Sequence, residues 1–323
     1  MTSSMDVITT VLPAIALEQV IGAPQSEVHP LRLLASSLHQ LLGNDEKSNY
    51  LPLTAGGGTA IFTTLKMVTA ISRKLPRPLG WALDTALLYL ILGPGRIAKM
   101  AENIKTVLSQ RNREAARELL GTELADRDVS QMDESQMAEA VIELIAVQTV
   151  SEVTAPLFYY AVGGVPIALA YYYVNQNIEE AVADGDETAV RVREWLNFIP
   201  ARVTALLMMV AAEIRHLIRS RHNIQGYVKR SQRLASQTTP MMAAWQTWRS
   251  DQDLTADLNS GQTISALAGG IGVKIGVVGA SGRQPEAEDI RAAVRIMQLT
   301  VGLFVGLYGF LRLLKLWGSR DRE

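Results

Sequence analysis

The feature that most constrains this chain is Ala155–Val174, a run of 20 residues without a charged side chain. A helix needs about 20 apolar residues to cross a hydrocarbon core roughly 30 Å thick, so this run predicts a single membrane span. Polar segments lie on both sides, Glu143–Glu152 before the run and Asn175–Arg202 after it, and we expect both to be irregular. Polar side chains at a membrane are costly and usually functional. The pattern therefore predicts a polar site at the edge of the membrane.

Composition narrows the class of protein and its partners. Hydrophobic residues make up 48% of the 323 residues and charged residues 20%, which lies between a soluble protein and a transporter with many spans. This balance favours a membrane protein with few spans, with the lipid bilayer as its first partner. The net charge of −1 gives no basic field for nucleic acid. With 0 Cys residues, disulfides, thiolate metal sites and cysteine nucleophiles are excluded.

Long apolar runs with helical periodicity dominate, and strand-like alternation is scarce. We expect an all-α fold: a polytopic integral-membrane helical bundle with amphipathic and re-entrant helices. Spans are expected in Ala155–Val174 and Ile296–Leu311, with about two to four more. The other helices expected are Val7–Ile21, Leu31–Leu42, Thr59–Ile71, Leu79–Leu92, Arg96–Leu120, Ser135–Thr149, Ile199–Ile218, Ile264–Val278 and Ile290–Trp317.

The chain is expected to form a single membrane domain over residues 1–323, with polar loops at about 96–135, 176–197 and 215–262. Lys and Arg gather in 96–127, in 215–233 and in the C-terminal tail. Because basic residues favour cytoplasmic loops, these three segments are expected to be cytoplasmic. This predicts a multi-pass protein of the cell inner membrane whose C-terminus is cytoplasmic.

Several strings resemble one family in the same order and spacing. They are RDVSQM (Arg127–Met132), EAVIELIAVQTVSEVTAPLFYYAVGGVPIALAYYYVN (Glu139–Asn175) and LNFIPARVTA (Leu196–Ala205). Leu17–Leu34 and Asn259–Gly276 continue the series. Together they resemble the cobalamin-biosynthesis CobD/CbiB family, which are integral-membrane adenosylcobinamide-phosphate synthases. The co-linear series, more than any one motif, makes the resemblance.

The resemblance implies a reaction. A carboxylate of adenosylcobyric acid, a corrinoid, would be activated with ATP and Mg²⁺ and then joined in amide linkage to aminopropanol or its phosphate. Mg and ATP would be the cofactors of an active enzyme. The residues that match the family imply catalytic roles for Glu143, Asp128 and Arg202, and ligand-binding roles for Arg127, Thr149, Asn175, Asn197 and Asn259. The metal ligands stay unknown; Asp128 and Glu143, with Glu152 or Glu194, could supply them.

Other interpretations of these residues stay open. Arg202 begins an apolar helix, where it could bind a phosphate or a corrinoid carboxylate, or extend as an interfacial arginine toward the headgroups. Asp128 could cap a helix. Glu143 lies on the same helix face as Glu139 and could be one of a solvated row.

The chain departs from the family mainly at its carboxylates. Glu18 replaces an early Asp, Ala23 replaces the Asp of Gly-Asp-Pro, and Ser151-Glu152 replaces an Asp-Gly pair. A site that holds Mg²⁺ against ATP needs such oxygens. We therefore expect reduced or lost synthase activity. The alternative is a catalytically degenerate membrane subunit that binds, regulates or scaffolds membrane protein partners, as in the related AmpE-like branch.

Overall fold

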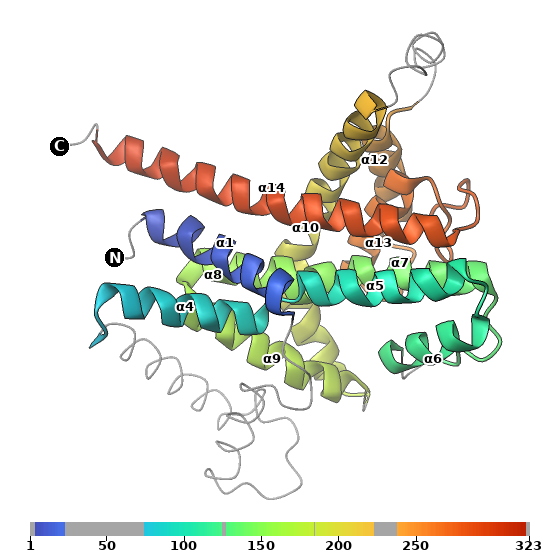
Figure 1. Ribbon diagram of the computed structural model, residues 1–323, viewed down its shortest axis with the longest axis horizontal. Helices are drawn as coiled ribbons and strands as arrows, with labels where there is room; N and C mark the ends of the chain where they lie inside the picture. The colour runs from blue at the N-terminus through green and yellow to red at the C-terminus, as the bar shows by residue number, and fades with distance from the viewer. Residues whose placement is uncertain (1–3, 23–73, 125–126, 184, 223–237, 321–323) are drawn as a thin grey trace, which may run out of the picture. The chain divides into compact units, whose positions relative to one another are not determined.

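The computed structural model describes residues 4–22, 74–124, 127–183, 185–222 and 238–320 (Figure 1). Within these ranges the chain is helical apart from turns and two isolated bridges, Val273–Arg283 and Ile275–Val278. The all-α prediction is confirmed. The elements are α1 (Ser4–Ile21), α4 (Arg77–Ile91), α5 (Pro94–Ser109), α6 (Arg113–Glu123), α7 (Glu134–Thr149), the π-helical turn η3 (Val150–Thr154), α8 (Ala155–Gly163), α9 (Val165–Ala183), α10 (Glu187–His222), α12 (Pro240–Asp251), α13 (Leu258–Ile271) and α14 (Ala287–Arg320).

Three segments of the described chain are long and apolar enough to cross a membrane: Glu134–Gly163, Glu187–Ser220 and Ala287–Lys315. A further apolar helix, Thr9–Ile21, is shorter. The third long segment contains Ile296–Leu311, one of the two spans expected from sequence. Helices of this length and composition are those of a helical membrane protein.

The other expected span, Ala155–Val174, is wrong as a single helix. Gly164 takes a φ of +75° and ends α8, and Pro166 stands at the second position of α9, where a missing N–H costs no hydrogen bond. The two helices fold back on each other: α8 packs on α9, and the Tyr159 and Tyr171 rings stack at a centroid distance of 4.8 Å. The charge-free run is therefore a helical hairpin, and the long apolar segment extends from α8 back into α7 instead.

The expectation of irregular flanks is also wrong. Glu143–Glu152 lies in α7 and η3, and most of Asn175–Arg202 lies in α9 and α10. The three stretches expected to be polar loops contain α5, α6, α12 and parts of α9, α10 and α13. Their amphipathic faces pack onto other helices, which polar composition alone did not indicate.

The remaining expected helices divide into confirmed, corrected and untested ones. α1, α4, α7 and α14 lie close to their predicted bounds. Arg96–Leu120 is two helices, because Arg111 takes a φ of 58° and Asn112 caps α6 by accepting the N–H of Ala115. Ile264–Val278 is helical only to Ile271, where Gly272 ends α13 with a φ of +80°. The expected Leu31–Leu42 and Thr59–Ile71 helices lie outside the described residues.

The helices group into two compact units. Unit 1 comprises Met1–Arg96, Ser151–Phe198 and Val305–Glu323, and unit 2 comprises Ile97–Val150 and Ile199–Phe304. The expectation of a single membrane domain stays a prediction. In unit 1, α4 packs on α1 and α9, and α8 packs on α9. Tyr89 Oη donates to the Gly22 carbonyl at 2.8 Å, and Trp81 Nε1 donates to the Thr9 carbonyl at 3.2 Å.

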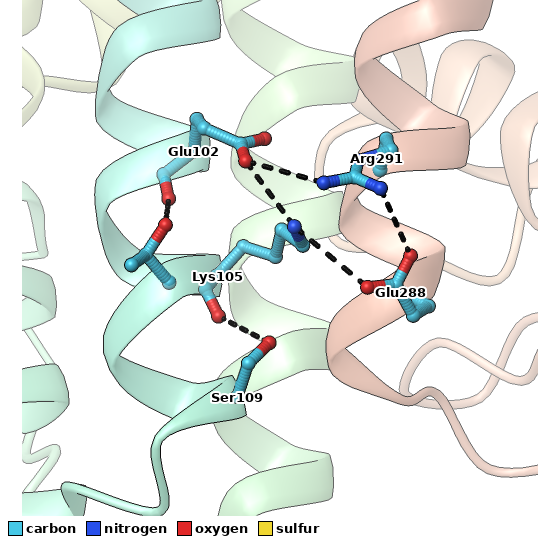
Figure 2. A network of polar contacts seen from close by, with 6 residues as sticks. Glu102, Lys105, Ser109, Glu288 and Arg291 are labelled. Carbon is cyan, nitrogen blue, oxygen red and sulfur yellow. Dashed lines mark hydrogen bonds and ion pairs between the residues drawn. The ribbon is translucent and has the colours of Figure 1, made fainter.

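In unit 2, α13 is the central element and is buried along most of its length between α12 and α7. Gly269 allows close approach, since a Cβ there would lie 2.7 Å from Ala244 Cα on α12. α5 and α14 are joined by a charge network of Glu102, Lys105, Glu288 and Arg291, hereafter the α5–α14 network (Figure 2).

Candidate functional site

A group of charged side chains in unit 1 lies where α4 ends and α5 begins. Leu92 and Gly93 connect the two helices, and Pro94-Gly95-Arg96 opens α5. Two carboxylates reach it, Glu18 from α1 and Glu152 from η3. We call Glu18, Arg96 and Glu152 the turn cluster. It gathers three charged side chains from segments far apart in the sequence.

Glu18 is fully buried, with a relative exposure of 0%. Its Oε2 accepts the backbone N–H of Gly95 at 2.6 Å, and its Oε1 accepts that of Arg96 at 2.8 Å. These N–H groups belong to the first turn of α5 and have no partner within that helix. Glu18 therefore caps α5 from another helix, and its negative charge faces the positive end of the α5 dipole. A Cβ on Gly95 would lie 2.5 Å from Glu18 Oε2, which explains why the turn carries glycine here.

Glu152 holds the other side of the turn. The Arg96 guanidinium pairs with both carboxylate oxygens of Glu152, and its Nε lies 3.1 Å from Oε2. The Gly93 N–H also donates to the Glu152 carbonyl at 3.2 Å. Glu152 stands in the π-helical turn, a local distortion that is frequent at functional sites. The side chains of Arg96 and Glu152 are 34% and 27% exposed, so the pair is partly open to solvent.

Only part of the turn cluster is predictable from the sequence. Glu18 matches a family Asp and Glu152 is a possible metal ligand, but neither is among the predicted catalytic or ligand-binding residues, and Arg96 is not predicted as a site residue. The available signal was a single acidic residue near the end of each of two apolar runs, together with the Gly-Pro-Gly break. It did not indicate which segments meet.

Arg127 and Glu143, both predicted site residues, form a two-armed ion pair in unit 2. Both arms measure 2.8 Å, from Arg127 Nη1 to Glu143 Oε2 and from Nη2 to Oε1. Asp128, the next residue, accepts the Ser130 N–H at 2.9 Å. Hydrogen bonds from the Ser130 side chain and backbone lower the pKa of the exposed Asp128 carboxyl. Asp128 thus stabilises a local turn, close to the capping role left open above.

Three more predicted residues of unit 2 lie deeper. Thr149 is buried, and its hydroxyl donates to the Ile145 carbonyl one turn earlier at 2.6 Å. Arg202 and Asn259 meet, since Arg202 Nη1 lies 3.5 Å from Asn259 Oδ1, at the limit of a hydrogen bond. Asn259 itself is buried at the start of α13, where Asp257 accepts its N–H at 2.9 Å.

The two remaining predicted residues, Asn175 and Asn197, lie together in unit 1 around Tyr171. The buried Tyr171 hydroxyl donates to Asn197 Oδ1 at 2.8 Å and lies 3.4 Å from Asn175 Oδ1. Tyr159, stacked on Tyr171, donates to the Leu196 carbonyl at 3.0 Å. These polar contacts join the α8–α9 hairpin to the first half of α10. The structure thus brings six of the predicted residues together in three groups, whereas the hydrogen bonds of Asp128 and Thr149 described above are to other residues. The functional roles of all eight stay predictions.

The family resemblance implies a Mg²⁺ cofactor. The question is whether the described residues supply the oxygen ligands that Mg²⁺ requires. Among the residues that the structure describes, no group of three or more His, Cys, Asp or Glu side chains could hold a metal ion. Glu143 is engaged by Arg127, Glu152 by Arg96, and Glu18 by two backbone donors. Mg²⁺ prefers an octahedron of oxygens that include carboxylates. The described side chains do not fit a preformed magnesium site.

The fold, helical with three helices long and apolar enough to cross a membrane, is that of a helical membrane protein. A family model described as CobD/Cbib protein matches residues 11–297. Cobalamin biosynthesis protein CbiB of Salmonella choleraesuis is 24% identical, over 90% of this chain and 93% of that protein. The probable cobalamin biosynthesis protein CobD of Methanothermobacter thermautotrophicus is 26% identical, over 93% of this chain and 96% of that protein.

A second CbiB, from Salmonella arizonae, is 28% identical over 62% of this chain and 67% of its own length. No solved structure matches the chain. Because the family model covers most of the sequence, the chain belongs to the CobD/CbiB family of cobalamin biosynthesis proteins.

Proposed function

We propose that this protein is a divergent CobD/CbiB membrane protein that binds a corrinoid, with reduced or lost capacity to join adenosylcobyric acid to aminopropanol or its phosphate. The family membership supports the corrinoid ligand. The proposed loss of activity is supported mainly by one observation, the pairing of Glu143 with Arg127 through both carboxylate oxygens.

A Mg-ATP site needs oxygen ligands that are free to bind the metal. Catalysis at a transferring phosphoryl group depends on oxygens that hold Mg²⁺ against the phosphates. The pair is partly exposed, at 45% for Arg127 and 25% for Glu143, so releasing Glu143 from Arg127 to bind metal costs about 1 kcal/mol. Glu152 meets the same competition from Arg96. Glu143 and Glu152 are therefore each paired with an arginine in the structure.

The test uses purified, detergent-solubilised protein with adenosylcobyric acid, with and without Mg-ATP and aminopropanol phosphate. Binding is measured directly and product by mass. We expect corrinoid binding with little or no product. Product at a rate typical of a working synthase would contradict the proposed loss. Absence of corrinoid binding would contradict the proposed ligand and favour the alternative, a subunit that acts on membrane protein partners.

Two variants sharpen the assay. Arg202→Ala should weaken corrinoid binding if Arg202 recognises an anionic group of the ligand, and unchanged binding removes it from the site. Glu143→Gln should leave any magnesium dependence of residual activity unaltered, because Glu143 is already engaged by Arg127. Loss of that dependence would instead assign Glu143 to the metal.

We also propose a multi-pass placement in the cytoplasmic membrane with a cytoplasmic C-terminus. Arg312 and Lys315 at the end of the Ala287–Lys315 segment support this orientation. A C-terminal fusion to alkaline phosphatase, which is active only outside the cytoplasm, should be inactive. An active fusion would reverse the orientation.

A further inference from the structure

Two buried asparagines of unit 1, Asn175 on α9 and Asn197 on α10, have incomplete hydrogen bonding; we call them the asparagine pair. Each is 6% exposed. Both turn their carboxamide oxygens to one group, the Tyr171 hydroxyl. Neither carboxamide nitrogen donates a hydrogen bond to another residue of the described chain. Each nitrogen carries two N–H donors, and buried donors of this kind normally have an acceptor. The asparagine pair therefore has room for a further partner.

The same place has unused acceptor capacity. The Tyr171 hydroxyl carries one hydrogen, and three oxygens compete for it: Asn197 Oδ1 at 2.8 Å, Asn175 Oδ1 at 3.4 Å and the Ser151 carbonyl at 3.4 Å. The hydrogen goes to the closest of them, Asn197 Oδ1, because the other two distances are near the limit of a hydrogen bond. Asn175 is thus left with both an acceptor oxygen and a donor nitrogen that can serve a ligand.

The charges beside the asparagine pair are already matched to each other. Glu179 lies one turn beyond Asn175 on α9, and Arg193 lies one turn before Asn197 on α10. Arg193 Nη1 lies 3.4 Å from Glu179 Oε2, so the two form an ion pair. A carboxylate or phosphate brought to the asparagines would lose its water and meet an arginine that is already engaged. The asparagine pair therefore favours a neutral polar group.

The carboxamide nitrogens are buried but not sealed. Neither is among the fully buried side-chain atoms that lack a hydrogen-bond partner in the described chain. Since both lack such a partner, each nitrogen keeps some contact with solvent. The neighbouring Glu179 side chain is 50% exposed. A small group at the end of a flexible arm can reach the asparagine pair in this situation, while the body of a larger ligand stays outside.

We propose that Asn175 and Asn197 bind a primary carboxamide of the corrinoid, one of the side-chain amides at the edge of its ring. A primary carboxamide is neutral and offers one acceptor oxygen and two N–H donors. It complements the Asn175 carboxamide through two hydrogen bonds, one in each direction, and its oxygen has a second lone pair for Asn197 Nδ2. This inference rests on the corrinoid ligand proposed above and deepens it, because it names the part of that ligand which unit 1 recognises.

The test compares two corrinoids on the full chain in detergent. One is adenosylcobyric acid, whose side-chain amides are intact, and the other is an adenosylcorrinoid with carboxylates in place of side-chain carboxamides. Equilibrium dialysis, read by corrinoid absorbance, gives the Kd of each for the parent protein and for Asn175→Leu, which removes the hydrogen-bonding groups at similar size. Asn177→Leu is the matched control, since Asn177 Nδ2 is satisfied within α9 by the Tyr173 carbonyl at 2.7 Å.

We expect the parent protein to bind the amide form about tenfold more tightly than the carboxylate form, because the carboxylates must lose water at a neutral site. Asn175→Leu should weaken binding of the amide form about tenfold and leave the carboxylate form unchanged, as expected for the loss of two neutral hydrogen bonds. Asn177→Leu should change neither Kd. If the leucine variant does not fold, Asn175→Asp keeps the shape of the side chain, lacks the donor nitrogen and should show the same loss.

Two results would overturn the inference and leave corrinoid binding itself intact. They are equal affinities of the parent protein for the two corrinoids, and equal weakening of both by Asn175→Leu. Water would then be the partner of the asparagine pair. Absence of binding by either corrinoid would instead overturn the proposed corrinoid ligand, and this inference with it.

Discussion

The turn cluster of unit 1 and the α5–α14 network of unit 2 use the same side-chain types in opposite ways. Each joins helices through carboxylates and cations. Glu18 of the turn cluster is 0% exposed and is satisfied by backbone N–H groups. In the network, the side chains of Glu288 and Arg291 are 67% and 50% exposed, and their closest approach is 3.6 Å (Figure 2).

This difference decides how much each group contributes to stability. A buried carboxylate cannot turn to water, so removing it leaves its donors without partners in the interior. Exposed ion pairs exchange readily with water and contribute little. Charge count alone would rank the network of four charged residues above the cluster of three, whereas burial reverses that order.

The largest effect is expected at Glu18. Glu18→Ala removes the acceptor of two N–H groups at the start of α5 and should lower the free energy of unfolding by about 3 kcal/mol or more. Glu18→Gln keeps one acceptor oxygen and should cost less. Unfolding is followed by circular dichroism during titration of the detergent-solubilised protein with dodecyl sulfate. An alanine variant as stable as the parent would show that burial does not separate the two regions.

A smaller effect is expected at Tyr171, also in the interior of unit 1. Tyr171→Phe leaves Asn197 Oδ1 without its donor and should lower the free energy of unfolding by about 1–2 kcal/mol. Tyr159→Phe is the matched control, because the stacked ring stays and the lost bond, to the Leu196 carbonyl, is less buried. The same titration measures both. An equal loss of unfolding free energy in the two variants would mean that burial of the hydroxyl does not determine its contribution to stability.

The sequence predicts helices better than it predicts where they meet. α1 and α4 were predictable because apolar periodicity runs until a glycine or a Gly-Pro pair stops it. The break inside Ala155–Val174 was not predicted, although Gly163-Gly164 precedes Pro166. Hydropathy describes one long span and a hairpin of two short helices equally well, and only the backbone at Gly164 distinguishes them.

Contacts between the site residues could not be predicted from the sequence for the same reason. Glu18 and Arg96 are 78 positions apart, and Arg127 and Glu143 are 16 apart. Helical spacing relates residues three or four positions apart, so neither contact follows from periodicity. The family resemblance identifies Arg127 and Glu143 as two separate site residues. Their ion pair, which bears on metal binding, appears only once the chain folds.

The smallest effect is expected in the α5–α14 network, whose charged side chains are mostly exposed. Arg291→Gln removes contacts of 3.5 Å to Glu102 and 3.6 Å to Glu288, all between half-exposed side chains, so the free energy of unfolding should change by less than about 0.5 kcal/mol. Raising the salt to about 1 M should remove even that difference, because the Debye length then falls to about 3 Å, comparable with these contacts. Lys105→Met tests the one buried member of the network, whose side chain is 8% exposed.

Lys105→Met keeps the apolar stem of the side chain and leaves Glu102 and Glu288 in contact with water, so we expect a loss within about 1 kcal/mol. A loss at Lys105 as large as that at Glu18 would show that the network acts as a buried ion pair despite its exposed partners. The decisive variable would then be the burial of one member of a charge network, and the exposure of the others would not limit its contribution.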